Sequence, residues 1–286
     1  MTKPPAMTAT CRRIECLSPA KLNLFLHITG RQANGYHTLQ TVFQLLDWGD
    51  DMVFEPVDTP GVRLVNPVVG VAHEDNLIIR AANALAAPEQ GVNISINKRI
   101  PQGGGMGGGS SNAASTLLAL NHLWDLNYSR DELADIGASL GADVPIFVRG
   151  QSAWAEGIGD IITPMNLPKR WFVILRPNCH VSTAKIFSAV QLTRDSSPIT
   201  MSAFFSGSIR NDLQVAVEAA YPEVGKALNL LNKFSPAMMT GSGGCVFAAV
   251  DDETSARHIA AATEGQFDTF VACGVNASPP VITHQY

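Results

Sequence analysis

The sequence predicts an α+β fold built from two domains. Stretches with strand periodicity are joined by hairpin signals as often as by helices, which favours antiparallel sheet. The 286 residues, 46% of them hydrophobic and 16% charged, suffice for two packed cores. Pro164 and Pro168 bracket a short irregular segment, which is the best candidate for a boundary. We therefore expect an N-terminal domain over residues 1–164 and a C-terminal domain over residues 165–286.

The first predicted strand covers residues 17–28. Apolar side chains alternate there with side chains of a more functional character, which indicates a strand with one buried face. The apolar set is Leu22, Leu24, Leu26 and Ile28, and the opposite set is Lys21, Asn23, Phe25 and His27. Asn34-Gly35 marks a tight turn after this strand. A second apolar run, residues 42–46, leads to a turn-like segment at residues 49–51.

The next elements lead into a glycine-rich stretch. Asn76 is suited to cap a short helix, and residues 92–96 alternate as a strand. The glycine-rich residues 103–109 follow, and we expect Ser110 or Ser111 to cap the helix after them.

A further helix start is marked by Ser129 and Glu132, which stand at capping-box spacing. Gly141 lies where the end of that helix would need a left-handed residue. Pro145 disfavours helix at the residue before it, so we expect Asp143 where a helix stops and an extended segment begins. That position presents a carboxylate to a cleft, although an aspartate near glycine and proline is by default a turn residue.

Beyond the boundary, residues 171–175 read as a strand and are followed by several helical stretches. A strand pair is expected around the glycine turn at residues 241–244, before a final α/β tail.

Composition excludes several classes of protein. The formal net charge of −5 and the lack of any basic cluster beyond Lys98-Arg99 argue against nucleic-acid partners and against a membrane surface. The first residues lack the apolar core of a signal peptide, and no apolar run is long enough for a transmembrane helix. The 5 cysteines are scattered without a CxxC pair, which favours a reduced, cytoplasmic location.

The strongest chemical signal is the glycine-rich stretch. Glycines let backbone N–H groups converge on a phosphate, and the following helix adds its free N–H groups and positive end. The two serines offer hydroxyls to phosphate oxygens or to Mg²⁺. A flexible linker is the alternative, but a strand before and a helix after leave little need for one. The formal GxGxxG match lacks the βαβ context of a dinucleotide site, and no Gly-Lys-Ser/Thr ends the loop as in a Walker A motif.

Three other segments gain weight only in combination. Lys21 on a strand usually indicates a solvated face, and Tyr36-His37 is more often a self-packed turn than a ligand platform. The glycine turn at residues 241–244 is by itself at least as compatible with a plain hairpin as with a ligand contact.

Together, these segments in this order resemble the GHMP kinases. The family pattern appears as Pro19-Ala20-Lys21, then as the Pro101 glycine loop, and finally as the C-terminal glycine turn. Further segments narrow the resemblance to bacterial family members of the non-mevalonate isoprenoid pathway, whose acceptor alcohol carries a cytidine diphosphate group. These segments are residues 19–26, 35–40, 75–77 and 141–145.

The resemblance implies a fold and two small molecules. The expected N-terminal domain binds nucleotide and is like ribosomal protein S5 domain 2, and the expected C-terminal domain is a ferredoxin-like α/β domain across a cleft. ATP is the implied phosphoryl donor, with Mg²⁺ bridging its oxygens through unknown protein ligands. A monomer or a homodimer is expected.

The resemblance also implies roles for individual residues. Asp143 would take the proton of the acceptor hydroxyl, and Lys21 would keep that carboxylate ionised and orient the hydroxyl. Tyr36 and Phe187 would sandwich the cytosine ring, while His37 and Asn23 would read its polar edge. The implied ATP-binding residues are Pro101, Gln102, Gly103, Gly104, Gly105, Met106, Gly107, Gly108, Gly109, Ser110 and Ser111, with Asn76 and Lys98 near the adenine.

Three alternatives remain at this point. These alternatives are a GHMP kinase for another small alcohol, a non-catalytic nucleotide-binding relative, and an NAD-dependent oxidoreductase. A kinase for another alcohol would not explain the Tyr36-His37 pair. A non-catalytic relative is disfavoured because both Lys21 and Asp143 are present.

Overall fold

The fold is described from a computed structural model that covers residues 12–33, 35–188, 193–207, 209–279 and 282–285. The strands are β1 (Arg12–Arg31), β2 (His37–Val57), β3 (Gly61–Leu64), β4 (Gly91–Asn97), β5 (Ala153–Glu156), β6 (Ile161–Pro164), β7 (Trp171–Arg176), β8 (Ala237–Met239), β9 (Val246–Val250), β10 (Asp268–Val275) and β11 (Ile282–Gln285). The helices are α1 (Leu77–Ala84), α2 (Gly108–Leu123), α3 (Arg130–Leu140), α4 (Val144–Arg149), α5 (Thr183–Phe187), α6 (Met201–Ser206), α7 (Gln214–Ala220), α8 (Pro222–Leu231) and α9 (Glu253–Thr263).

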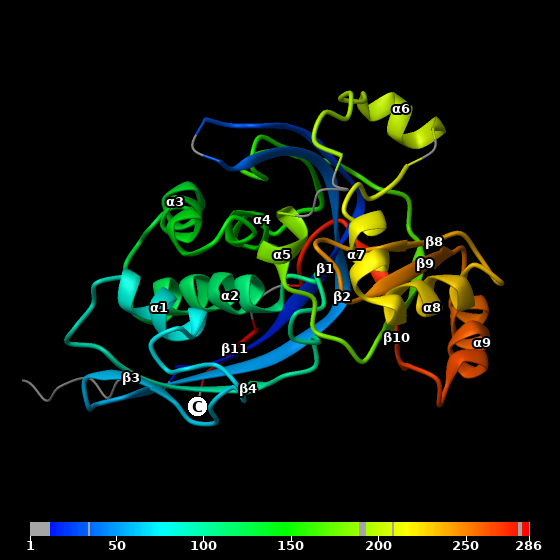
Figure 1. Cartoon of the computed structure of the whole chain (residues 1–286). Helices are drawn as coiled ribbons and strands as arrows, with labels where there is room; N and C mark the ends of the chain where they lie inside the picture. Colours follow the sequence, from blue (N-terminus) through cyan, green and yellow to red (C-terminus); the bar gives the residue numbers. More distant parts are fainter. Residues whose placement is uncertain (1–11, 34, 189–192, 208, 280–281, 286) are drawn as a thin grey trace, which may run out of the picture.

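The strands form a connected sheet in the order β11-β1-β2-β10-β7-β9-β8, with β4 and β5 also paired to β2. All of these pairings are antiparallel, whereas β3 pairs with β4 in parallel. In Figure 1, helices α1 to α4 gather beside the lower part of the long β1–β2 ribbon, and α7 to α9 lie with β8 to β10 at its other side. The predicted α+β class is confirmed.

Strands β1 and β2 tie the two sides of the molecule together. They contain 20 and 21 residues, and bulges interrupt their register near Lys21 and Asn23. Ile14 at the start of β1 packs in a core with α1 to α4, whereas Ile28 near its end packs in a core with α7 to α9. The residues between these two cores are therefore held in a fixed position on a rigid ribbon.

The boundary at residue 164/165 stays a prediction. Two of the hydrophobic clusters divide as that boundary would have them, because α1 to α4 pack in one and α7 to α9 in the other. A third cluster joins the two halves, since Leu22 packs in it with Phe172 and Ile174. Two strands of the second half nevertheless join the first: β10 pairs with β2, and β11 pairs with β1.

Two expectations about β1 and β2 were wrong. Lys21, Asn23 and His27 are as buried as the apolar residues between them, so both faces of β1 are covered. Residues 49–51 form no turn, because β2 continues through them in register with β1 and β4. The polar residues at both places indicated exposure to solvent, but segments distant in the sequence pack over them.

Helix boundaries followed the sequence in part. Asn76 caps α1 through its side chain, and Ser129 and Glu132 form the expected capping box on α3. The cap of α2 was misplaced, because the N-cap is Gly107, in a left-handed conformation. Gly141 has φ 177°, which is extended rather than left-handed. Pro145 does not extend the chain after Asp143; it lies in the first turn of α4, where its missing N–H leaves no bond unmade.

Candidate functional site

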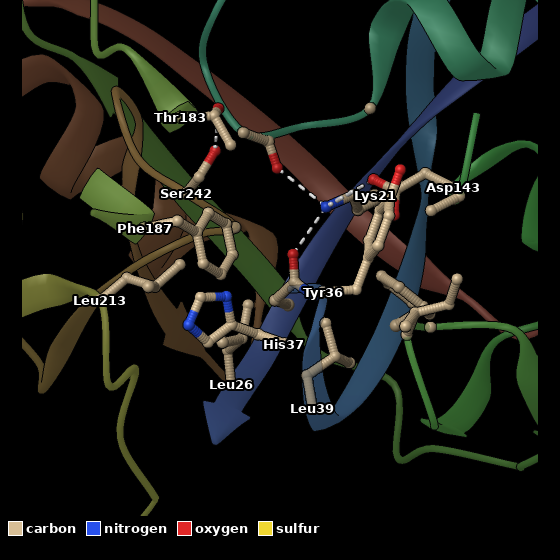
Figure 2. A pocket seen from close by; sticks show the side chains of 18 of the residues that line it. Lys21, Leu26, Tyr36, His37, Leu39, Asp143, Thr183, Phe187, Leu213 and Ser242 are labelled. Carbon is tan, nitrogen blue, oxygen red and sulfur yellow. Dashed lines mark hydrogen bonds and ion pairs between the residues drawn. The ribbon is translucent and has the colours of Figure 1, made fainter. Parts of the chain in front are cut away.

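One cavity, with a volume of about 670 Å³, draws its lining from segments far apart in the sequence. Lys21 and Phe43 come from β1 and β2, Gly105 from the glycine loop, and Asp143 from the turn before α4. Phe187 and Ser242 line it from the second half of the chain. In Figure 2, Lys21 and Asp143 lie at one side of the cavity and Phe187 and His37 at the other.

Lys21 lies at the centre of the polar part of this cavity. Its ammonium donates to Asn23 Oδ1 at 2.6 Å and to the Gly105 carbonyl at 3.0 Å, and it lies 3.4 Å from Asp143 Oδ2. The lysine side chain is 3% exposed, and the aspartate side chain is 35% exposed. The buried cation is thus held by fixed acceptors, while the carboxylate keeps a face open to a ligand.

Asp143 is placed by the tight junction of α3 with α4. Gly137 on α3 lets Val144 approach so closely that a Cβ there would lie 2.7 Å from Val144 Cγ1. The N–H of Val144 donates to the Gly141 carbonyl, which fixes the turn that carries Asp143. The carboxylate is therefore positioned by backbone packing on one side of the cavity.

The glycine loop is shaped by left-handed residues. Gly103, Gly105 and Gly107 have φ of 68°, 73° and 72°. The N–H of Ser111 makes the first helical bond of α2, to the Gly107 carbonyl, so the N–H groups of Gly108, Gly109 and Ser110 have no carbonyl one turn earlier. Three N–H groups without a hydrogen-bond partner in the described part of the chain, at the positive end of a 16-residue helix, form an anion-binding arrangement.

The C-terminal glycine turn packs on this loop. A Cβ on Gly105 would lie 2.3 Å from the Thr240 carbonyl oxygen, and one on Gly241 would lie 2.7 Å from the Gly105 carbonyl oxygen. Thr240 Oγ1 accepts the N–H of Asn23 at 2.9 Å. The turn at residues 241–244 therefore connects the glycine loop with β1. Sequence reasoning had left its role open.

Several predicted site residues have their side chains engaged within the protein. Asn23 donates its amide to Thr41 besides accepting from Lys21, and Asn76 uses its oxygen to cap α1. Ser111 is fully buried and accepts a hydrogen bond from Ser18. Asn23 as a base-reading residue, and Asn76 and Ser111 as ATP contacts, remain predictions.

The predicted cytosine-binding residues Asn23, Tyr36, His37 and Phe187 all line the cavity. Tyr36 is 64% exposed, and the rings of His37 and Phe187 lie 5.1 Å apart at an interplanar angle of 33°. Burial, then the cations of Arg194 and Arg31, lower the pKa of His37. Arg194 Nε donates to His37 Nε2 at 3.3 Å, which the neutral ring accepts. Leu26, Leu39 and Leu213 make the surrounding wall apolar.

Sequence reasoning missed some residues near the site. Arg194 lies in a polar segment without a pattern, and His180 packs its ring against Gly103 from the second half of the chain. Asp50 resembled a turn residue but is completely buried. None of the three carries a local signal, because each contact is made across the fold.

The described residues hold neither a group of three or more His, Cys, Asp and Glu side chains suited to a metal nor a helix that could cross a membrane.

Two family models match the chain. The model for the GHMP kinases N-terminal domain matches residues 76–151, and that for the GHMP kinases C-terminal region matches residues 198–268. The first match contains the glycine loop and Asp143, and the second ends within β10.

Curated relatives cover almost the whole chain. The 4-diphosphocytidyl-2-C-methyl-D-erythritol kinase of Marinobacter nauticus is 54% identical over 275 residues, which is 93% of this chain and 96% of the relative. The kinase of the same name from Pseudomonas paraeruginosa is 51% identical over 269 residues, covering 93% and 95% of the two chains.

Solved structures agree in fold. A crystal structure of 4-(cytidine 5'-diphospho)-2C-methyl-D-erythritol kinase has a TM-score of 0.80 and 32% identity, covering 91% of this chain and 98% of that chain. A homoserine kinase from Cytophaga hutchinsonii has a TM-score of 0.66 at 16% identity, covering 99% and 100%, and so shows the fold alone.

Proposed function

The chain belongs to the GHMP kinase family, and we propose that it transfers the γ-phosphoryl group of ATP to the 2-hydroxyl group of 4-diphosphocytidyl-2-C-methyl-D-erythritol, a step of the non-mevalonate isoprenoid precursor pathway. The observation that carries this proposal is the Lys21–Asp143 pair, which lies between the anion-binding start of α2 and a group of aromatic side chains. These side chains, Tyr36, His37 and Phe187, are called the aromatic wall below.

The free N–H groups of Gly108, Gly109 and Ser110 would hold the triphosphate. The acceptor hydroxyl would then lie at Asp143, whose carboxylate accepts its proton as the hydroxyl oxygen bonds to the γ-phosphorus. The bond from that phosphorus to the β-phosphate oxygen breaks, and ADP leaves. Positioning and charge neutralisation dominate such a reaction, so a weakly basic carboxylate suffices.

Lys21 supports this step in two ways. Its ammonium, 3.4 Å from Asp143 Oδ2, holds that carboxylate in place beside the acceptor hydroxyl. It also places a positive charge next to the oxygens on which negative charge develops. Asn23 and Gly105 hold the ammonium in place, so little reorganisation is needed during the reaction.

Mg²⁺ fits the residues at this place. Mg²⁺ is bound in kinases by one or two carboxylates together with substrate phosphates, so a large protein ligand cluster is not required. Asp143 supplies a partly exposed carboxylate, and Ser110 Oγ lies 3.8 Å from the position of a Cβ on Gly141, in the turn before Asp143. Bound there, the ion would neutralise charge on the phosphoryl group in transfer.

The aromatic wall supports the cytidine-bearing acceptor. Tyr36 and Phe187 offer ring faces for a base, and His37, held neutral by burial and its neighbours, offers a ring N–H. Because Arg194 donates to Nε2, the neutral ring carries its proton on Nδ1. A kinase of a simple alcohol such as homoserine would have no use for this wall.

An activity assay tests the proposal. The purified protein is given ATP, Mg²⁺ and one of four acceptors: 4-diphosphocytidyl-2-C-methyl-D-erythritol, mevalonate, homoserine or galactose. ADP formation with the first acceptor alone is the expected result. ADP formation with another acceptor instead would replace the proposed substrate, and ATP binding without turnover on any of the four would favour a non-catalytic relative. A cytoplasmic location and a monomeric or homodimeric state stay predictions.

A further inference from the structure

Asp50 is a completely buried carboxylate on β2, and it lies behind the glycine loop rather than in the cavity. A buried charge is retained only where its bonds are satisfied. Within the described residues, the four hydrogen bonds of Asp50 go to the segments that flank the loop. Oδ1 accepts the N–H of Arg99 at 2.7 Å and that of Ile100 at 2.8 Å, while Oδ2 accepts from Lys98 Nζ at 2.5 Å and from Asn112 Nδ2 at 2.9 Å.

These four contacts lie on both sides of the loop. Lys98, Arg99 and Ile100 precede the glycine-rich residues, and Asn112 follows them in the second turn of α2. One carboxylate therefore fixes the entrance and the exit of the loop relative to each other. Ser18 extends the network, because its hydroxyl accepts from Asn112 and donates to Ser111.

The same carboxylate directs the ammonium of Lys98. That ammonium donates to Asp50 Oδ2 and, at 3.0 Å, to Asn112 Oδ1. It also lies 3.2 Å from the position of a Cβ on Gly108, which is the first residue of α2. Within the described part of the chain two acceptors use two of its three N–H groups, so a third remains for a ligand. The side chain is 21% exposed, so that N–H can reach solvent.

We propose that Asp50 is a positioning residue for the nucleotide, which holds both flanks of the glycine loop and aims Lys98 at bound ATP. This inference rests on the proposed function. It assigns Asp50 no contact with ATP: the carboxylate acts through Lys98 and through the backbone N–H groups at the start of α2. The negative charge of Asp50 is matched by Lys98, so it does not repel the triphosphate.

The test uses Asp50→Asn, which keeps the size of the side chain and removes its charge. The matched control is Asp51→Asn on the same strand, because Asp51 is 51% exposed and pairs with Arg99 at the surface. Affinity for a non-hydrolysable ATP analogue with Mg²⁺ is measured calorimetrically without acceptor, and steady-state assays give kcat and the two KM values. We expect Asp50→Asn to weaken nucleotide binding about 10-fold or more, since hydrogen bonds to charged groups are the strong ones. The KM for the acceptor and the affinity of the control should change less than about twofold.

A double-mutant cycle with Lys98→Met separates positioning from mere structural support. Removing both charges relieves the unpaired buried charge that each single variant leaves, so the double variant should regain thermal stability relative to Lys98→Met. Its nucleotide affinity should nevertheless be at least as weak as that of Lys98→Met, because no ammonium is left to position and the flanks of the loop have lost the carboxylate that holds them. If Asp50→Asn fails to fold, the comparison of Lys98→Met with the double variant still decides the matter.

Three results would overturn the inference. The first is unchanged nucleotide affinity in Asp50→Asn, and the second is nucleotide affinity that recovers with stability in the double variant. The third is a wild-type protein that binds no nucleotide, which would also remove the proposed function. A wild-type protein that binds nucleotide but phosphorylates no acceptor would contradict only the proposed function, because the binding arm needs no turnover.

Discussion

The ammonium of Lys21 lies 3.4 Å from Oδ2 of Asp143, although the two residues belong to the first strand and to the turn before α4. Lys21 is buried, its ammonium donates to Asn23 and to the glycine loop, and it lies 5.3 Å from the centroid of the Phe43 ring, so β1, β2 and the loop together set the position of the cation. Asp143 is the more accessible partner. The pair thus joins a fixed cation to a carboxylate that a substrate can reach.

Replacement of this carboxylate should separate binding from turnover. In Asp143→Asn the amide keeps the shape of the side chain but no longer accepts a proton or pairs with Lys21. We expect kcat to fall by about 10²–10⁴-fold while ATP affinity stays within a few-fold. Asp135→Asn, on the exposed side of α3, is the control and should keep full activity. Loss of ATP binding in Asp143→Asn would make Asp143 structural rather than catalytic.

Removal of the aromatic wall should affect only the acceptor. Phe187→Ala takes away a stacking face, and such a loss costs about 1–3 kcal/mol per base, or roughly 5–150-fold in the KM for the cytidine-bearing acceptor. The KM for ATP should not change. Phe205→Ala, at a phenylalanine that is 56% exposed on α6, is the matched control. Equal effects on both substrates would mean that Phe187 supports the fold and not the base.

A methyl group at Gly105 should close the contact between the two glycine segments. Its Cβ would lie 2.3 Å from the Thr240 carbonyl oxygen, and its φ of 73° is itself unfavourable for alanine. Gly265→Ala is the matched control, because Gly265 has φ 78° with nothing near its Cβ position. Both variants should lose about 1–2 kcal/mol from the backbone alone. Only Gly105→Ala should lose ATP affinity as well, which calorimetry measures. Equal losses of ATP affinity in Gly105→Ala and Gly265→Ala would contradict the close packing of the glycine loop on the C-terminal glycine turn.

Stability should depend on the titration of His27. This ring is buried, and neither of its nitrogens has a hydrogen-bond partner in the described residues, so burial lowers its pKa from the ordinary value of 6.5. At pH values between the ordinary pKa of the unfolded chain and the lower pKa of the folded chain, His27 binds more protons in the unfolded chain than in the folded one. The unfolding free energy therefore rises with pH in this window. The stabilisation by neutral His27 is complete at pH values above the ordinary pKa of 6.5, and it is lost as pH falls below that pKa.

His27→Leu removes this contribution to acid sensitivity. The unfolding free energies of wild type and His27→Leu are measured by denaturant titration from pH 7.5 down to pH 5. As pH falls, the unfolding free energy of the wild type should decrease relative to that of His27→Leu. A difference that is constant with pH would show that His27 titrates alike in the folded and unfolded chain.

The sequence predicted those parts of the structure that depend on neighbouring residues. The capping box of α3 and the cap of α1 are local hydrogen bonds, and both are present. The glycine-rich stretch was correctly placed between a strand and a helix, because six glycines in seven residues fit few other structures there.

Features that depend on distant segments could not be predicted in the same way. Lys21 looked solvated, but the glycine loop and Asn23 bury it. Asp50 resembles a turn residue in the sequence, but its four donors in the described structure come from the segment that follows β4 and from α2. The N-cap of α2 is Gly107 rather than a serine, because the helix already begins at Gly108; Ser111 lies inside the helix and accepts a hydrogen bond from Ser18.

Identification of the reaction product gives the sharpest test of the proposed transfer. The protein is incubated with ATP, Mg²⁺ and 4-diphosphocytidyl-2-C-methyl-D-erythritol, and the product is examined by phosphorus NMR with mass spectrometry. The expected product carries one new phosphomonoester, coupled to the carbon that bears the 2-hydroxyl group, with its diphosphate intact. Free phosphate without a phosphorylated acceptor, or a phosphate on another hydroxyl group, would contradict the roles given to Lys21 and Asp143.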